Sequence, residues 1–292
     1  MCSACRGPIE ADMGLRRGFA DTSFGQIHFR TAGEGRAGVP LVMFHGSPGS
    51  SFSLYPLVER LGQKRRVIAP DTPGNGDSTP HPKAAPEILD LALAHAEAIA
   101  TLGFGKVDLY GFHTGASIAI ELSLQRPGLV RRMILDGCSL FDPGDSEHLL
   151  NHDHAPVMAA DLDGTQLLRA WHMVRDAHVF WPWWGREKTH LRGIGLPSPD
   201  YLHQETLEVL KALQTYDRSY RAALRYRKKD RLPRVAVPTL CAAAPNDMLL
   251  PYLDAVAVLI PGAEKARTPA NVTVPAEDIA GTAEIFEQFL EK

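Results

Sequence analysis

The chain has 292 residues, of which 45% are hydrophobic and 22% charged, and its formal net charge is -3. These values are ordinary for one large globular domain or for a domain that carries an insertion. The slightly negative charge gives no general electrostatic reason to expect nucleic-acid binding, and no apolar run approaches the roughly 20 residues that span a bilayer.

The four cysteines do not suggest a disulfide framework. Cys2 and Cys5 form one Cys-x-x-Cys motif, without a second pair to complete a zinc site. Cys138 and Cys241 lie in or after apolar strand patterns, where we expect them to be buried. Polar and charged residues follow Cys5, so no signal peptide is predicted. We therefore expect a reduced, cytoplasmic protein.

The first half of the chain alternates strand and helix patterns. Residues 1–17 are expected to form a mobile segment, and residues 18–32 predict two short strands around a turn at 22–25. The predicted elements that follow are a strand at 39–44, a helix at 53–62, a strand at 66–69, a helix at 86–102, a strand at 107–110, a helix at 116–124 and a strand at 132–136. This alternation predicts an α/β fold with a mostly parallel, doubly wound sheet.

The alternation stops near residue 140 and resumes with a strand at 236–240, before a closing amphipathic helix at 279–290. The segment between holds all four tryptophans and seven of the twelve histidines. We predict that residues 140–232 form a helical cap over the carboxyl ends of the strands, where open α/β sheets place their ligands. The core would then comprise residues 18–139 and 233–292.

Three loops follow predicted strands in this order. The first is His45-Gly46-Ser47-Pro48-Gly49-Ser50, the second spans 69–78, and the third is Gly111-Phe112-His113-Thr114-Gly115. The third has the strand–turn–helix context and the Gly-x-nucleophile-x-Gly pattern of a nucleophile elbow. From about residue 18 to 291 the sequence resembles the α/β-hydrolase family, and most closely its cap-bearing members such as epoxide hydrolases, haloalkane dehalogenases and carbon–carbon bond hydrolases.

The resemblance implies an oxyanion hole made by the backbone N–H groups of Ser47 and Thr114, and a catalytic acid at Asp247. The other two triad positions depart from the family. His113 replaces the elbow serine, and no histidine occurs after His203, so that Asn271 is the nearest polar residue where the family histidine is expected. Neither the serine triad nor an aspartate nucleophile can operate in this chain.

We hypothesise that His113 and Asp247 form a dyad that replaces the triad, with His113 as general base and Asp247 as the group that orients it. The favoured activity is cofactor-independent hydrolysis of a small apolar ester or lactone, and attack by His113 itself through an acyl-imidazole is less favoured. One alternative is a lyase, isomerase or decarboxylase reaction through an enolate in the same site. Another is a non-catalytic ligand-binding protein, in which His113 only fills the turn.

Other polar and aromatic clusters have simpler interpretations. Asp71 is expected to anchor its loop, Asp142 is a minor alternative acid, and the basic run at 218–234 predicts a solvent-facing helix, with binding of an anionic substrate tail as the alternative. The cluster Glu147, His148, His152, Asp153 and His154 is expected to be solvated, so no metal is predicted, and no cofactor. His178 is a minor candidate for a second acid or base.

The residues predicted to contact a small-molecule substrate are His45, Trp181, Trp184, His172 and Asn271. A homodimer is compatible with this interpretation, and neither nucleic acid nor a membrane is an expected partner.

Overall fold

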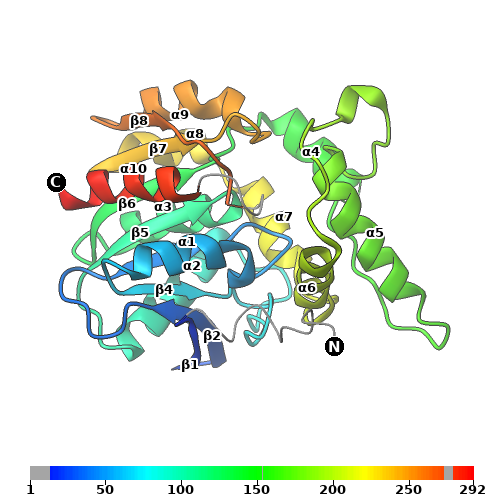
Figure 1. Cartoon of the computed structure of the whole chain (residues 1–292), viewed down its shortest axis with the longest axis horizontal. Coiled ribbons are helices and arrows are strands. Elements are labelled where there is room, and N and C mark those ends of the chain that lie inside the picture. The colour runs from blue at the N-terminus through cyan, green and yellow to red at the C-terminus, as the bar shows by residue number, and fades with distance from the viewer. Residues whose placement is uncertain (1–13, 153, 273–278) are drawn as a thin grey trace, which may run out of the picture.

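The computed structural model describes residues 14–152, 154–272 and 279–292 (Figure 1). Cys2, Cys5, Asp153 and most of the predicted N-terminal segment lie outside the described residues. The first strand begins at Arg16, inside the segment that was predicted to be mobile. No helix among the described residues is both long and apolar enough to cross a membrane.

The centre of the fold is one eight-stranded sheet with the strand order β1-β2-β4-β3-β5-β6-β7-β8. The strands are β1 (Arg16–Thr22), β2 (Gly25–Ala32), β3 (Leu41–Phe44), β4 (Val67–Pro70), β5 (Val107–Phe112), β6 (Val130–Asp136), β7 (Thr239–Ala243) and β8 (Glu264–Arg267). The pairs β1–β2 and β2–β4 are antiparallel, and every other pair is parallel. This confirms the predicted mostly parallel, doubly wound sheet.

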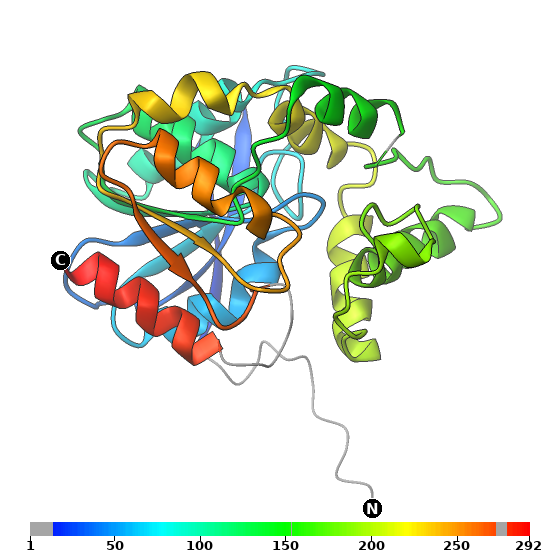
Figure 2. The same ribbon diagram turned by 90° about the horizontal axis from the view of Figure 1, so that it is seen from above.

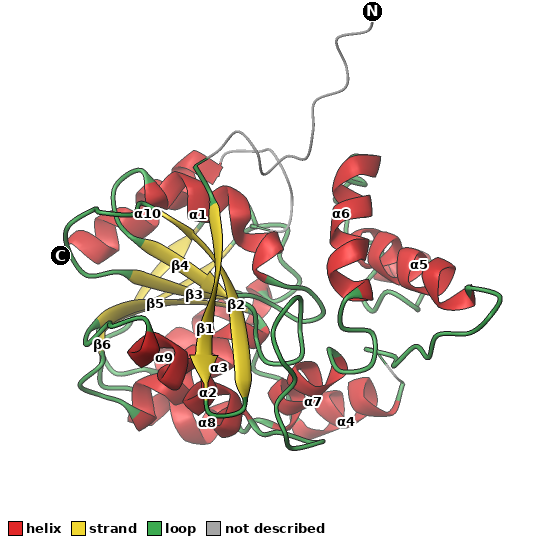
Figure 3. Ribbon diagram, turned by 90° about the horizontal axis from the view of Figure 1, so that it is seen from below, coloured by secondary structure: helices red, strands yellow, loops and turns green. Residues whose placement is uncertain are grey.

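Helices cover both faces of the sheet, and this explains the continuous apolar runs in the sequence. Figure 3 shows helices on either side of the sheet. Every residue of β3, β4 and β5 is buried, as expected for strands packed on both faces. One apolar cluster contains α1 (Tyr55–Gly62) and α10 (Ile279–Glu291). The cluster on the other face contains α2 (Ile88–Thr101), α3 (Thr114–Gln125) and α9 (Leu253–Leu259). β7 begins at Thr239, later than predicted, because Pro238 has no N–H to donate to a sheet.

A helical insertion separates β6 from β7, as the change in composition predicted. Its helices are α4 (Pro143–Asn151), α5 (Thr165–Val179), α6 (Pro199–Leu210), α7 (Asp217–Arg225) and α8 (Lys228–Arg231). Figures 1 and 2 show α5 and α6 side by side at a distance from the sheet, whereas α7 lies against the core. The insertion has an apolar cluster of its own, with Trp171, Trp181 and Trp183 packed at its edge.

Buried charges connect the insertion to the core. Arg30 on β2 is fully buried, and its guanidinium lies 3.2 Å from the carboxylate of Glu208 on α6. The Ser50 hydroxyl donates to the same carboxylate at 2.7 Å, and Lys211 bridges Glu208 and Asp77 at 2.8 Å each. A buried charge is strongly unfavourable without its partner, so these contacts fix α6 to the loops that follow β3 and β4.

Candidate active site

The turn at 111–115 holds its central side chain in a strained backbone conformation. β5 ends at Phe112, α3 begins at Thr114, and His113 between them has φ +50° and ψ -107°. It is the only non-glycine residue with positive φ in the described part of the chain. Such a conformation costs about 1–3 kcal/mol and persists only where the surroundings enforce it.

The flanking glycines allow the turn to be this tight. A Cβ on Gly115 would lie 2.1 Å from the Phe44 carbonyl oxygen, and one on Gly111 would lie 2.4 Å from the Gly115 carbonyl oxygen. Only glycine fits such close backbone approaches. The sequence therefore builds a complete nucleophile-elbow scaffold and places an imidazole at its apex.

His113 and Asp247 lie within hydrogen-bonding distance. The Nε2 atom of His113 is 3.0 Å from Oδ2 and 3.1 Å from Oδ1 of Asp247, which follows β7. The carboxylate side chain is only 1% exposed, whereas the imidazole is 21% exposed. The imidazole also stacks on Phe112, with ring centroids 3.8 Å apart. The ring is therefore held on one side by a buried acid and on its face by a neighbouring aromatic ring.

Two further donors hold the Asp247 carboxylate. The Leu249 N–H donates to Oδ1 at 2.7 Å, and the Asn271 side-chain amide donates to Oδ2 at 3.1 Å. Burial alone would raise the pKa of Asp247, but His113, the Leu249 N–H and the nearby Arg192 hold it below its ordinary value. When the His113 Nε2–H donates a hydrogen bond to the Asp247 carboxylate, Nδ1 is the ring nitrogen that is left as an acceptor.

Gly137, which no predicted motif includes, makes room for this pair. It has φ +61°, and a Cβ there would lie 2.5 Å from Asp247 Oδ2 and 2.7 Å from His113 Nε2. A real Cβ does not approach other atoms so closely. In the sequence, Gly137 could have been recognised because it directly follows the strand that ends at Asp136. That strand ends at the edge of the sheet where the elbow also lies.

Ser47 and Thr114, the predicted oxyanion-hole residues, both line a cavity next to His113. The Thr114 N–H belongs to the first turn of α3, where backbone N–H groups have no acceptor within the helix. The Ser47 side chain is tied to α7, because its hydroxyl lies 2.8 Å from the Ser219 hydroxyl. Asn75 donates to that same Ser219 oxygen at 3.0 Å. The insertion thus fixes the loop that carries the Ser47 N–H.

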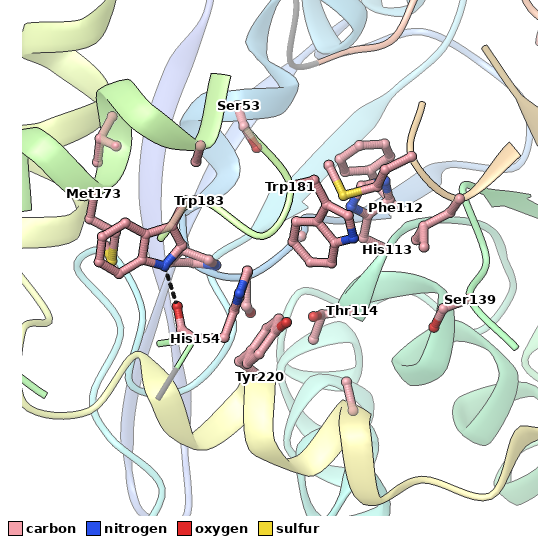
Figure 4. A pocket seen from close by; sticks show the side chains of 18 of the residues that line it. Ser53, Phe112, His113, Thr114, Ser139, His154, Met173, Trp181, Trp183 and Tyr220 are labelled. Carbon is pink, nitrogen blue, oxygen red and sulfur yellow. Dashed lines mark hydrogen bonds between the residues drawn. The ribbon is translucent and has the colours of Figure 1, made fainter. Parts of the chain in front are cut away.

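The cavity has a volume of about 150 Å³ and lies between the elbow and the insertion (Figure 4). Its walls are largely apolar and aromatic, and include Phe112, Met173, Val174, Trp181, Trp183 and Leu224. Three cavity residues have a buried polar atom without a partner among the described residues: His154 Nδ1, Tyr220 Oη and Arg192 Nε. Burial lowers the pKa of His154 to about 3, so its ring is neutral. An apolar cavity with a few unpaired polar atoms is typical of a small-molecule site.

Trp181 is the one residue of the predicted substrate-contacting set that lines this cavity. His45 is fully buried in its turn, with Nδ1 2.7 Å from the Gly46 carbonyl oxygen and Nε2 accepting from the Thr72 N–H. Trp184 stacks on His152 instead, and His172 is exposed. Asn271 supports Asp247 and does not line the cavity. These four residues therefore do not line the cavity next to His113.

Asp71 and Asp142 have local structural roles. Asp71 accepts hydrogen bonds from the Ser51 and Asp77 N–H groups and pairs with His28, so it anchors its loop. Asp142 caps α4. Among residues 14–152, 154–272 and 279–292, the only group with metal-ligand spacing is His28, Asp71 and Asp77, and it lies outside the predicted cluster around His148.

Asp136, the last residue of β6, is a second carboxyl group near the dyad. Its side chain accepts a hydrogen bond from the Tyr110 hydroxyl at 2.8 Å, and its carbonyl oxygen accepts from the His113 N–H at 3.1 Å. Burial, reinforced by the charge of Asp247, raises the pKa of Asp136 to about 7. At pH values between about 4 and 7, the Asp136 carboxyl group therefore keeps its proton in the folded protein but has lost it in the unfolded chain.

The Asp136→Asn variant should be more stable than the wild type, and more so at pH 8 than at pH 5. Because the folded pKa is the higher one, the stability of the wild type falls as pH rises from about 4 to 7. Asparagine mimics the protonated acid and removes this loss, which is on the order of a few kcal/mol. Thermal unfolding across this pH range measures the difference. The exposed Asp163→Asn variant is the control, and equal gains for the two variants would contradict this assignment.

Comparison with known proteins supports the α/β-hydrolase fold. A profile of the alpha/beta hydrolase fold matches residues 39–171. The chain is 37% identical over 111 residues to (E)-2-((N-methylformamido)methylene)succinate hydrolase from Acinetobacter baylyi, covering 38% of this chain and 41% of that protein. It is 35% identical over 123 residues to a soluble epoxide hydrolase from Corynebacterium sp., covering 41% of this chain and 42% of that protein. The matched segments thus span less than half of either relative.

A solved structure extends the likeness of the fold to nearly the whole chain. A hydrolase from Pseudomonas aeruginosa superimposes with a TM-score of 0.70 at 18% identity, covering 94% of this chain and 98% of that one. The family profile includes the loop at 45–50 and the elbow at 111–115, and it ends before Asp247. The chain has the α/β-hydrolase fold, and its residues 39–171 match the model of that family.

Proposed function

We propose that this protein hydrolyses a small, largely apolar ester or lactone, with His113 as general base in place of the family serine. The observation that carries the proposal is the hydrogen bond between His113 Nε2 and the buried carboxylate of Asp247. A base within hydrogen-bonding distance of a group that orients it is the arrangement that general-base catalysis requires. The two relatives are both named as hydrolases, which supports hydrolysis as the reaction class.

The proposed reaction needs one water molecule and no covalent intermediate. Nδ1 of His113 takes a proton from water as the water oxygen attacks the substrate carbonyl, and Asp247 stabilises the imidazolium that forms. The negatively charged oxygen of the tetrahedral intermediate accepts hydrogen bonds from the Ser47 and Thr114 N–H groups. Because these donors are backbone groups, the replacement of the family serine by His113 does not remove them. When the tetrahedral intermediate collapses, the leaving alkoxide takes the proton from Nδ1, and His113 returns to its neutral form.

The cavity supports the proposed substrate class. Trp181, Trp183 and Met173 offer an apolar surface to a small substrate, as is typical of small-molecule sites. Arg192 adds a cation within electrostatic reach of Asp247. That charge favours a substrate or intermediate that carries negative charge.

A panel of short-chain esters and lactones tests this proposal against its alternatives. We expect turnover with release of one acid and one alcohol group per bond broken, measured by titration of the acid and by mass spectrometry. Turnover of carbonyl compounds that lack a hydrolysable bond, with exchange of an α-hydrogen for deuterium, would favour the enolate alternative. Ligand binding without turnover of any compound, unaffected by His113→Ala, would indicate a non-catalytic protein.

A further inference from the structure

A second cavity of about 400 Å³ lies beside the first, between α4 and the segment that joins α7 to α8. The two cavities share four wall residues, Ser139, Phe141, Ala223 and Leu224. A group bound in the second cavity therefore lies next to the cavity that holds His113. The second cavity also contains part of the basic run at 218–234, which the proposed hydrolysis does not use.

Lys228 is the most unusual residue of the second cavity. Its side chain is buried, with 6% of the residue exposed. Its ammonium donates to the Ser139 hydroxyl at 3.0 Å and approaches the Ala223 carbonyl oxygen at 3.5 Å. No carboxylate among the described residues lies within ion-pair distance of it. Burial lowers the pKa of Lys228, and the nearby Cys138 thiol offsets this effect only in part, so the ammonium is unfavourable there.

The rest of the lining is also rich in positive charge. Four cationic side chains and two carboxylates line the cavity, namely Arg225, Arg227, Lys228, Lys229, Glu147 and Asp230. Arg227 and Asp230 pair with each other at 2.7 Å. Arg225 and Lys229 make no ion pair with a residue in the described ranges. The cavity thus has a buried cation at its wall and further cations at its exposed rim.

We infer that this second cavity binds an anionic group, a carboxylate or a phosphate ester, through Lys228 with help from Arg225 and Lys229. An ammonium has three protons, and its two protein acceptors leave one for a ligand oxygen. An anion would supply the compensating charge that the protein lacks. The shared walls make this anion the distal end of a substrate whose carbonyl reaches His113. That last link rests on the proposed function, whereas the anion site itself does not.

Lys228 has one structural alternative role, which is to cap the carbonyl groups at the end of α7. The two roles differ in their response to Lys228→Met. Methionine fills a similar volume without a charge, so loss of an uncompensated ammonium should leave the melting temperature unchanged or raise it in anion-free buffer. Loss of a needed cap should lower it.

Isothermal titration calorimetry on the full chain tests the anion site, with sodium phosphate and sodium acetate as probes at constant ionic strength. We expect the wild type to bind at least one of them, and Lys228→Met to bind it at least about tenfold more weakly, a difference of about 1.4 kcal/mol. Tighter binding of phosphate would identify a phosphate ester, and tighter binding of acetate a carboxylate. Lys188→Met, which removes an exposed lysine of the same insertion, is the matched control and should bind as the wild type does.

The His113→Ala variant should bind the anion with unchanged affinity, which separates this inference from the proposed hydrolysis. Absence of binding to the wild type, or equal binding by Lys228→Met, would overturn the inference. If Lys228→Met does not fold, Arg225→Gln decides instead. Because Arg225 lies at the exposed rim, its loss should weaken binding by a smaller factor, and unchanged affinity would count against the site.

Discussion

The His113→Ala variant is expected to hydrolyse its ester or lactone substrate about 10²–10⁴-fold more slowly, measured as kcat/KM. The reason is that no other basic nitrogen in the cavity is paired with the buried Asp247 carboxylate. The proposed oxyanion-hole groups are the backbone N–H groups of Ser47 and Thr114, so they remain in this variant and should leave some activity above the uncatalysed rate.

This variant should fold normally. Alanine experiences the same backbone strain as histidine at φ +50°, so the substitution adds no conformational cost at the turn. Added imidazole should restore part of the activity, because it can occupy the space that the ring leaves and take the proton from water. Wild-type activity in His113→Ala, at an unchanged melting temperature, would show that His113 only fills the elbow.

The Gly137→Ala variant is expected to lose both stability and activity. The new Cβ would lie within 2.5–2.7 Å of Asp247 Oδ2 and of two ring atoms of His113, and the backbone would hold alanine at φ +61°. Overpacking and a left-handed alanine together cost about 2–5 kcal/mol. Urea unfolding measures the loss of stability, and kcat/KM measures the displacement of the dyad.

Gly128→Ala provides the matched control. A Cβ at Gly128 meets no atom within 4 Å, and its φ is not positive, so this variant should retain both stability and activity. If Gly137→Ala behaved like Gly128→Ala, the space around His113 and Asp247 would not be the constraint that the structure indicates.

The elbow and its acid could be predicted because chain order fixes them. In a parallel sheet the loops after successive strands meet at one edge, so a glycine-flanked residue after β5 and an aspartate after β7 come together whatever their side chains are. The predicted helical insertion likewise followed from a change in composition. Chain order therefore brings residues 113 and 247 together, while the room for their side chains also depends on Gly137.

The contacts inside the cavity could not be predicted in the same way, because they depend on which face of an irregular insertion points inward. His172 and Met173 are neighbours on α5, but the helix buries Met173 in the cavity wall and exposes His172. Arg192 lies in a segment without regular structure, so no periodicity marked it as a cavity residue. His45 was assigned from its loop alone, and only the fold shows that its two nitrogens are used within that loop.

A double-mutant cycle on His113 and Asp247 tests the dyad most directly. The kcat/KM values of the wild type, His113→Ala, Asp247→Asn and the double variant are measured on one ester or lactone. If Asp247 acts only through His113, the double variant should be about as slow as His113→Ala alone, because removal of one member of a coupled pair removes the contribution of the other. Additive losses, with the double variant slower by the product of the two single effects, would show independent roles and contradict a His113–Asp247 dyad.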